Sequence, residues 1–99
     1  MQIQNGTSPS NENVVSIIDL LSSKGRVKIL YLLAKYNELN ITQIVKMTKM
    51  NSTQVNTHLK YFVNNKVIEE KKFGRVKIYR LMTEYYKIKL LQTFFTHWD

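Results

Sequence analysis

Cysteine is absent from this 99-residue sequence, which has only one proline and three glycines. Without cysteine the chain has no disulfide, no thiolate metal site and no cysteine nucleophile. Three isolated glycines make no glycine-rich phosphate loop. Acidic residues are also scarce, because seven Asp and Glu stand against fifteen Lys and Arg and leave a net charge of +8. This balance indicates an anionic partner such as nucleic acid.

Long hydrophobic runs are missing as well. No apolar run reaches the roughly 18 to 20 residues of a membrane span, and the N-terminus lacks the apolar core of a signal peptide. We therefore expect a cytoplasmic protein with no membrane partner. The length suits one domain. The polar segment 1–13 is predicted to be a disordered tail, and residues 14–98 are predicted to form the domain.

The chain shows no pattern of catalytic or metal-binding residues. Its acids are scattered along the sequence, and Ser, His and acid never assemble a plausible triad. The two histidines, His58 and His97, each lack a second ligand at helical spacing. We therefore expect a protein that is not an enzyme and takes no metal or cofactor.

One long segment, residues 39–68, contains four lysines and not a single Asp or Glu. Within it, residues 51–64 have the period of a helix with two unlike faces. One face is apolar: Val55, His58, Leu59 and Phe62, with Val63 beside them. The other is small, hydrogen-bonding or positive: Thr53, Asn56, Thr57, Lys60 and Asn64. A carboxylate beside phosphates would repel them, so a face without acids indicates a DNA-reading helix.

The flanking segments predict a mainly α domain with a small β-hairpin. Further helices are expected at residues 13–22, 24–37, 43–48 and 83–98, with a strand stub at 39–41. Thr42 and Asn51 are expected to cap two of these helices, and Asn64-Asn65 to end one in the left-handed conformation. Residues 67–81 are predicted to be a hairpin that bends at Phe73-Gly74. Two short helices followed by a basic hairpin describe a winged helix-turn-helix.

The same residues resemble a known family. Residues 21–30 (LSSKGRVKIL) are similar to the opening of ArsR-type repressor domains, and residues 50–60 (MNSTQVNTHLK) to their recognition helix. Val67-Ile68 and Gly74-Arg75, with Tyr79 and Leu81 behind them, resemble the wing of this family. The chain, rich in lysine and isoleucine, also resembles small archaeal and archaeal-virus winged-helix regulators. Lys49 and Lys66 stand where the family often has glycine, and the ligands of its metal-sensing members are missing.

From the pattern and the resemblance we predict a site that binds double-stranded DNA. Base contacts are assigned to the exposed helix face, and phosphate contacts to lysines and the wing. The predicted residues are Gln43, Ser52, Thr53, Asn56, Thr57, Lys60, Lys72, Arg75 and Lys77. His58 is expected to be a hydrogen-bonded, partly buried histidine, not a base contact. Phe73, at the hairpin tip, is expected either to fold back on the hairpin or to meet sugar or a partner.

The last helix carries apolar side chains over about 200° of its wheel, more than one core contact needs. We therefore predict a homodimer, as the resemblance also implies. The predicted interface comprises Val14, Ile17, Ile18, Leu21, Ile88, Leu91, Phe94, Phe95 and Trp98. The predicted function is a sequence-specific transcriptional regulator. Repression is preferred over activation only because it needs less machinery. Two alternatives stay open: a winged-helix module that docks on a protein of the transcription apparatus, and an architectural protein that coats DNA without sequence preference.

Overall fold

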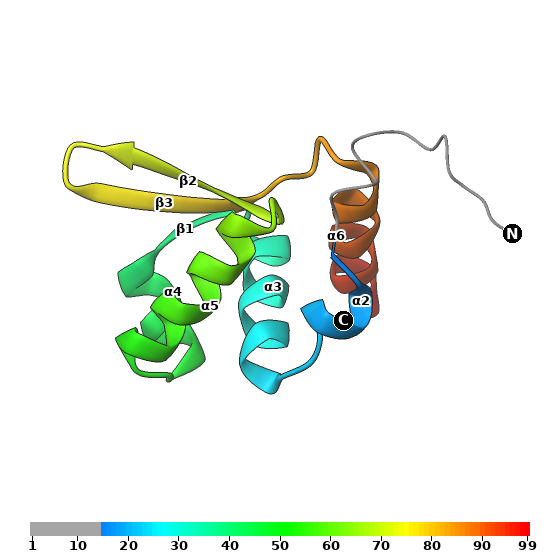
Figure 1. The fold of residues 1–99 in the computed structure, drawn as a ribbon, viewed down its shortest axis with the longest axis horizontal. Helices are drawn as coiled ribbons and strands as arrows, with labels where there is room; N and C mark the ends of the chain where they lie inside the picture. The colour runs from blue at the N-terminus through cyan, green and yellow to red at the C-terminus, as the bar shows by residue number, and fades with distance from the viewer. Residues whose placement is uncertain (1–14) are drawn as a thin grey trace, which may run out of the picture.

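A computed structural model of the chain describes residues 15–99, in which helices lie beneath a small antiparallel sheet (Figure 1). The predicted tail 1–13 and the predicted interface residue Val14 lie outside these residues. The elements run in the order α2 (Ile17–Leu20), α3 (Lys24–Tyr36), β1 (Glu38–Asn40), α4 (Ile41–Thr48), α5 (Ser52–Asn64), β2 (Ile68–Phe73), β3 (Val76–Leu81) and α6 (Tyr86–Trp98). This confirms the mainly α, winged helix-turn-helix class.

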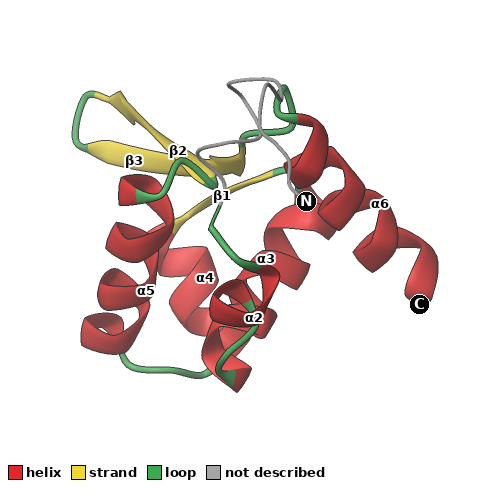
Figure 2. Cartoon of the chain, turned by 45° about the vertical axis from the view of Figure 1, so that its right-hand side comes forward, coloured by secondary structure: helices red, strands yellow, loops and turns green. Residues whose placement is uncertain are grey.

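Helix α3 is the centre of the arrangement. Helices α4 and α5 pack on one side of it and α6 on the other (Figure 2). The largest fully buried side chains come from α3, α4, α5, β2 and α6 and the residue before β2: Ile29, Leu30, Leu33, Ile44, Val55, Leu59, Phe62, Val67, Ile68 and Ile88. The apolar period of each helix therefore meets a single shared core.

The sheet has the order β1-β3-β2, with both pairs antiparallel. The predicted stub at 39–41 is present one residue earlier, as β1, which pairs Leu39 with Tyr79 of β3. The hairpin bends at Gly74, as predicted, with a φ of 63° that glycine adopts without steric cost. The hairpin projects beyond the helices and forms the wing (Figure 1).

Helix α4 begins earlier than predicted, and Thr42 is not its cap. The Asn40 side chain accepts a hydrogen bond from the Gln43 backbone N–H at 2.8 Å, and the Gln43 side chain accepts from the Asn40 N–H at 2.9 Å. This reciprocal capping box satisfies two backbone donors at once, which a lone Thr42 cap cannot do.

The left-handed residue after α5 is Lys66, not Asn64 or Asn65 as predicted. The Val67 N–H donates to the Phe62 carbonyl at 2.9 Å, and the Lys66 N–H donates to the Val63 carbonyl at 3.1 Å. These two bonds form a Schellman motif, in which the residue after the cap must be left-handed. Lys66 has φ 59°, and Lys49, which ends α4, has φ 61°.

Both terminal helices are shorter than predicted. Within the described residues, the first helix is a single turn, α2, whose Ile17 and Ile18 are exposed. Helix α6 begins at Tyr86 and not at residue 83. Two hydrogen bonds from Arg80 to Glu84 and one from the Tyr85 N–H to the Met82 carbonyl hold the preceding residues in a turn.

Candidate DNA-binding surface

Helix α5 presents the face that the sequence predicts. Its cap is Asn51, whose side chain accepts from the Gln54 N–H at 2.8 Å. Val55, Leu59 and Phe62 are buried on its inner side. The predicted DNA-contacting residues of this helix are all exposed: Ser52, Thr53, Asn56, Thr57 and Lys60. The apolar side therefore anchors the helix and leaves these five side chains available to a ligand.

Arg26 of α3 helps to fix the direction of α5. Its guanidinium lies 3.6 Å from the centre of the Tyr61 ring on α5, a cation–π contact. The same group donates to the Ser22 hydroxyl at 2.9 Å and to the Asp19 carbonyl. One side chain therefore joins the turn after α2 to the last half of the recognition helix.

Gly25 permits a close approach between α3 and α5. A Cβ at this position would lie 2.9 Å from His58 Nε2 and 2.8 Å from Met50 Cε. His58 is partly buried, as predicted, but no hydrogen bond to its ring forms within residues 15–99, contrary to expectation. Burial, together with the charge of Arg26, lowers the pKa of His58 below its ordinary value.

A shallow pocket of about 300 Å³ beside His58 contains residues that the sequence prediction missed. Lys24 and Lys28 of α3 line it together with Gln54 of α5. These lysines lie before the acid-free segment in the sequence, so the pattern that identified α5 gave no reason to include them. Their position beside the first turns of α5 adds positive charge next to the reading face.

Two predicted contact residues already use part of their hydrogen-bonding capacity. The Thr57 hydroxyl donates to the Thr53 carbonyl at 2.9 Å, which leaves its oxygen as an acceptor and its methyl group exposed. Gln43 uses its carbonyl oxygen in the cap of α4, which leaves its amide NH₂ as a donor. Asn56 forms no side-chain hydrogen bond within the described part of the chain, so both its donor and its acceptor are available.

The wing places two lysines opposite each other. Lys72 of β2 pairs with Lys77 of β3, on the face of the hairpin that also carries Glu70 and Tyr79. Like charges directly across a ladder repel each other, and an anion bound between them would relieve that repulsion. The predicted wing residue Arg75 lies in the exposed turn beside Gly74.

A cleft of about 220 Å³ joins the wing to α5. Asn56 and Lys60 line it from the helix and Lys77 from the wing, so the structure brings these three predicted residues together. Glu70, an acid that the prediction left out, also lines the cleft. It accepts a hydrogen bond from the Tyr79 hydroxyl at 2.7 Å. Burial and this bond raise the pKa of Tyr79. Side chains alternate between the two faces along a strand, so the sequence alone could have placed Glu70 on the same face as Lys72.

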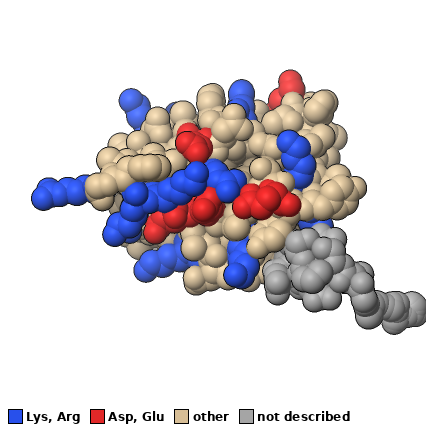
Figure 3. Space-filling model, turned by 90° about the horizontal axis from the view of Figure 1, so that it is seen from above, with Lys and Arg blue, Asp and Glu red and all other residues tan. Residues whose placement is uncertain are grey.

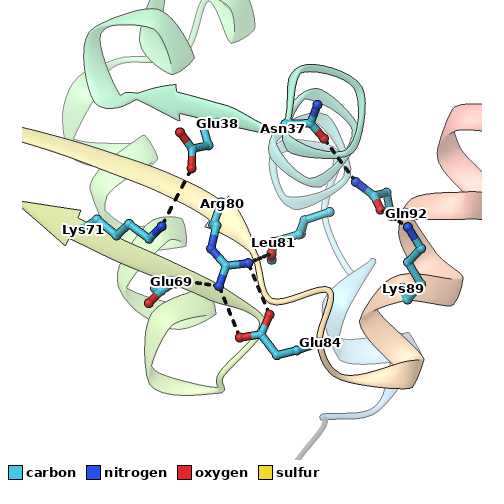
Figure 4. Close-up of polar contacts among 9 residues, drawn as sticks. All are labelled: Asn37, Glu38, Glu69, Lys71, Arg80, Leu81, Glu84, Lys89 and Gln92. Atoms are coloured by element: carbon cyan, nitrogen blue, oxygen red, sulfur yellow. Dashed lines mark hydrogen bonds and ion pairs between the residues drawn. The ribbon is translucent and has the colours of Figure 1, made fainter.

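The opposite face of the sheet has mixed charge. Arg80 binds Glu69 at 2.7 Å and Glu84 at 3.2 Å, and Lys71 lies 3.9 Å from Glu38 (Figure 4). Seen from above, acidic and basic side chains alternate across this surface (Figure 3). Hydrogen bonds from Arg80 lower the pKa of Glu84. Three acids, Glu38, Glu69 and Glu84, therefore neutralise Lys71 and Arg80 on this face, while Glu70 lies on the face of the lysine pair.

The predicted interface residues of α6 divide into two groups. Ile88, Leu91 and Phe95, which the sequence assigned to the dimer interface, are instead buried within the chain's own core. Phe95 packs edge-on against Tyr31 of α3, with ring centres 6.0 Å apart. The exposed apolar side chains of α6 are Tyr86, Leu90, Phe94 and Trp98.

Helices α2 and α6 enclose an apolar groove of about 580 Å³. The predicted interface residues Ile17, Leu21 and Phe94 line it, and so does Leu90, which the prediction did not include. The rings of Phe94 and Trp98 are 5.5 Å apart. The exposed apolar area of α6 is therefore continuous with the groove.

Among residues 15–99, no three His, Cys, Asp or Glu side chains come together as a metal site. His97 instead places Nδ1 2.9 Å from the Thr93 carbonyl. At thirteen residues, the longest helices of this part of the chain fall short of the length and apolarity of a membrane span.

Part of the chain matches a known family of regulators. The family described as bacterial regulatory protein, arsR family, matches residues 23–65, from the cap of α3 to the end of α5. No curated protein sequence matches the chain.

Solved structures share the fold across the whole described domain. HlyU from Vibrio cholerae N16961 is 18% identical, with a TM-score of 0.67 over 89% of this chain and 97% of that chain. The transcriptional repressor PagR of Bacillus anthracis is 27% identical, with a TM-score of 0.65 over 83% of this chain and 95% of that chain. The transcriptional repressor BigR from Xylella fastidiosa is 14% identical, with a TM-score of 0.67 over 83% and 82%. The chain therefore resembles the ArsR family over residues 23–65 and has the winged helix-turn-helix fold of these solved structures.

Proposed function

We propose that the chain is a homodimeric repressor that reads a specific sequence in double-stranded DNA. The observation that carries this proposal is the joined surface of α5 and the wing. Asn56, Lys60 and Lys77 line one cleft, and no acid stands on the exposed face of α5. The similar structures PagR and BigR, both described as transcriptional repressors, support the sign of regulation.

The hydrogen bonds of the surface support a separate chemical role for each proposed contact. Asn56 has the donor and acceptor that match the N6 and N7 edge of adenine. Thr57 offers an acceptor to an exocyclic amino group and a methyl group to thymine. The unused amide NH₂ of Gln43 suits a phosphate oxygen at the start of α4.

Phosphate binding is assigned to the lysines and to the wing. Lys60 lies on α5, and Lys72 and Lys77 face the same side from the wing. Arg75 extends this positive strip to the turn of the hairpin. Each such contact releases condensed counterions, so affinity should fall steeply as salt rises.

Dimerisation through α6 and α2 completes the proposal. Leu90, Phe94 and Trp98 form an exposed apolar surface that continues into the groove lined by Ile17 and Leu21. A two-fold axis there would place two α5 helices in successive major grooves, about 34 Å apart. The preferred site should then be an inverted repeat with half-sites near one helical turn.

Selection of bound fragments from random duplex DNA, followed by anisotropy titration, tests the proposal. Asn56→Ala should weaken binding to the selected duplex by about 1 to 3 kcal/mol and leave binding to a scrambled duplex unchanged. Lys72→Ala should weaken binding to both and reduce the slope of log affinity against log salt by about 0.9. Gln92→Ala, an amide removed from α6, is the matched control.

The outcomes separate the three functional classes. Equal losses on selected and scrambled duplexes for Asn56→Ala would indicate an architectural protein that coats DNA. Failure to bind any duplex would leave only the protein-docking module. Recovery of a direct repeat, or of a single half-site, would contradict the two-fold arrangement.

A further inference from the structure

The tip of the wing carries an exposed apolar pair. Phe73 and Val76 face each other as the last pair of the β2–β3 ladder, and they are 64% and 49% exposed. No aromatic ring among residues 15–99 stacks on Phe73, so it does not fold back into an aromatic contact on the hairpin. The hairpin holds this pair well beyond the helices (Figure 1).

Basic residues flank the apolar pair along the chain, and those on its own face, Lys71 and Arg80, are paired with acids. Residues 71–80 contain five Lys and Arg and no acid. Lys72 and Lys77, one step before Phe73 and Val76 in the ladder, point to the opposite face of the hairpin. The tip therefore has an apolar face and a cationic face, joined at the turn by Gly74 and Arg75.

A tip with one apolar face and one cationic face fits the edge of a nucleic-acid duplex. An exposed apolar pair alone would suit a protein partner, but here the cationic face continues into the cleft shared by Lys77, Lys60 and Asn56. The cationic face of the tip and α5 thus belong to one continuous surface, with the apolar pair on the other face of the hairpin. The absent side chain of Gly74 keeps the turn narrow, which suits a minor groove about 6 Å wide.

We propose that the wing tip enters the minor groove beside the major groove that α5 reads, and that Phe73 acts there as an apolar wedge at a base-pair step. Val76 supports the ring from the opposite strand, while Lys72, Arg75 and Lys77 bind the phosphates on either side. Apolar wedges of this kind partly unstack a step and bend the duplex. The inference rests on the proposed DNA-binding function and adds a specificity determinant, because pyrimidine–purine steps deform most easily.

The test uses the duplex recovered by selection, with 2-aminopurine placed in turn at each step flanking a half-site. The intact chain should raise 2-aminopurine fluorescence at one flanking step and shorten the end-to-end distance measured by energy transfer. Phe73→Ala should abolish both changes and lower affinity about tenfold, the scale of one lost stacking contact. Its salt slope should stay unchanged, because Phe73 carries no charge.

Three matched variants distinguish an apolar wedge at Phe73 from other causes of the fluorescence rise. Phe73→Leu keeps an apolar wedge and should preserve most of the fluorescence rise. Lys72→Ala should reduce the salt slope yet keep the rise at saturating protein. Tyr36→Ala, which removes an exposed aromatic ring at the end of α3, should change neither quantity.

The proposal and the function on which it rests fail in different ways. If Phe73→Ala binds and bends the selected duplex like the intact chain, the wedge is refuted, and the Asn56→Ala result still supports sequence reading. If the intact chain raises no fluorescence at any flanking step, the wedge is again refuted. If the intact chain binds no duplex, the proposed function fails and the wedge fails with it.

Discussion

Replacement of Phe94 should separate the proposed dimer without unfolding the chain. Phe94 is 53% exposed, and its neighbours Leu90 and Trp98 are 49% and 74% exposed. All three border the buried residues Leu91 and Phe95 but expose about half or more of their own surface. A substitution at Phe94 therefore removes mainly exposed area, together with one edge contact between the rings of Phe94 and Phe95, whose centres are 5.7 Å apart.

The expected loss of association free energy follows from the exposed fraction of the Phe94 side chain. Full burial of a large apolar side chain contributes about 1.5 to 3 kcal/mol, so the exposed half of Phe94 offers about 1 to 1.5 kcal/mol per copy. A symmetric dimer contains two copies, so Phe94→Ala should weaken association by about 2 to 3 kcal/mol, or roughly 30- to 150-fold. Phe94→Asp should abolish the dimer, because it also places a charge in an apolar interface.

Sedimentation and fluorescence dilution both measure this effect. Trp98 is the single tryptophan of the chain and belongs to the proposed interface, so its emission should move to longer wavelength as the dimer dissociates. Met47→Ala, which removes an exposed apolar side chain of α4, is the control for association. Leu91→Ala is the control for folding, and it should cost about 2 to 5 kcal/mol of stability.

Two results would refute this reasoning. A monomeric intact chain at micromolar concentration would remove the dimer and, with it, the inverted-repeat site. A dimer that survives Phe94→Asp but separates on a substitution in the exposed part of α4 would place the interface elsewhere.

Two further predictions concern stability. The pKa of His58 is lowered from 6.5 in the folded chain, so the unfolded chain binds more protons just below pH 6.5. The free energy of unfolding should therefore fall as pH drops through this range. Urea titrations should show a smaller fall for His58→Gln, and an equal fall would contradict the assignment. Lys66 holds a left-handed conformation that costs a side chain about 1 to 2 kcal/mol, so Lys66→Gly should raise the free energy of unfolding by up to about 1 kcal/mol. An unchanged or lower value in thermal unfolding would count against that strain.

The recognition helix was predictable because several local signals agree there. The apolar period places Val55, Leu59 and Phe62 on one side, Asn51 supplies the cap, and the polar face has no acid. The hairpin was predictable for a similar reason, since Gly74 allows the bend between two strands of alternating character. In both segments, local propensity and tertiary packing require the same conformation.

The orientation of α6 could not be predicted, because its apolar side chains cover too much of the wheel to choose one buried face. The choice is made by tertiary contacts, among them the packing of Phe95 against Tyr31 of α3. The start of α4 is a different case, because the spacing of Asn40 and Gln43 is a capping-box pattern visible in the sequence. Gln43 was assigned to DNA on other grounds, and the structure shows that it also caps the helix.

The net charge of +8 understates the positive potential on the α5 side of the molecule. Three of the seven acids, Glu38, Glu69 and Glu84, are paired with Lys71 and Arg80 on the outer face of the sheet. These three carboxylates neutralise Lys71 and Arg80, so they do little to offset the lysines and arginine of the wing turn and of α5 on the other side. A polyanion approaching from solution should be steered toward that side, and the preference should weaken once the Debye length falls to about 3 Å near 1 M salt. The outer ion pairs therefore favour the orientation in which α5 meets the major groove, although none of them touches DNA in the proposed complex.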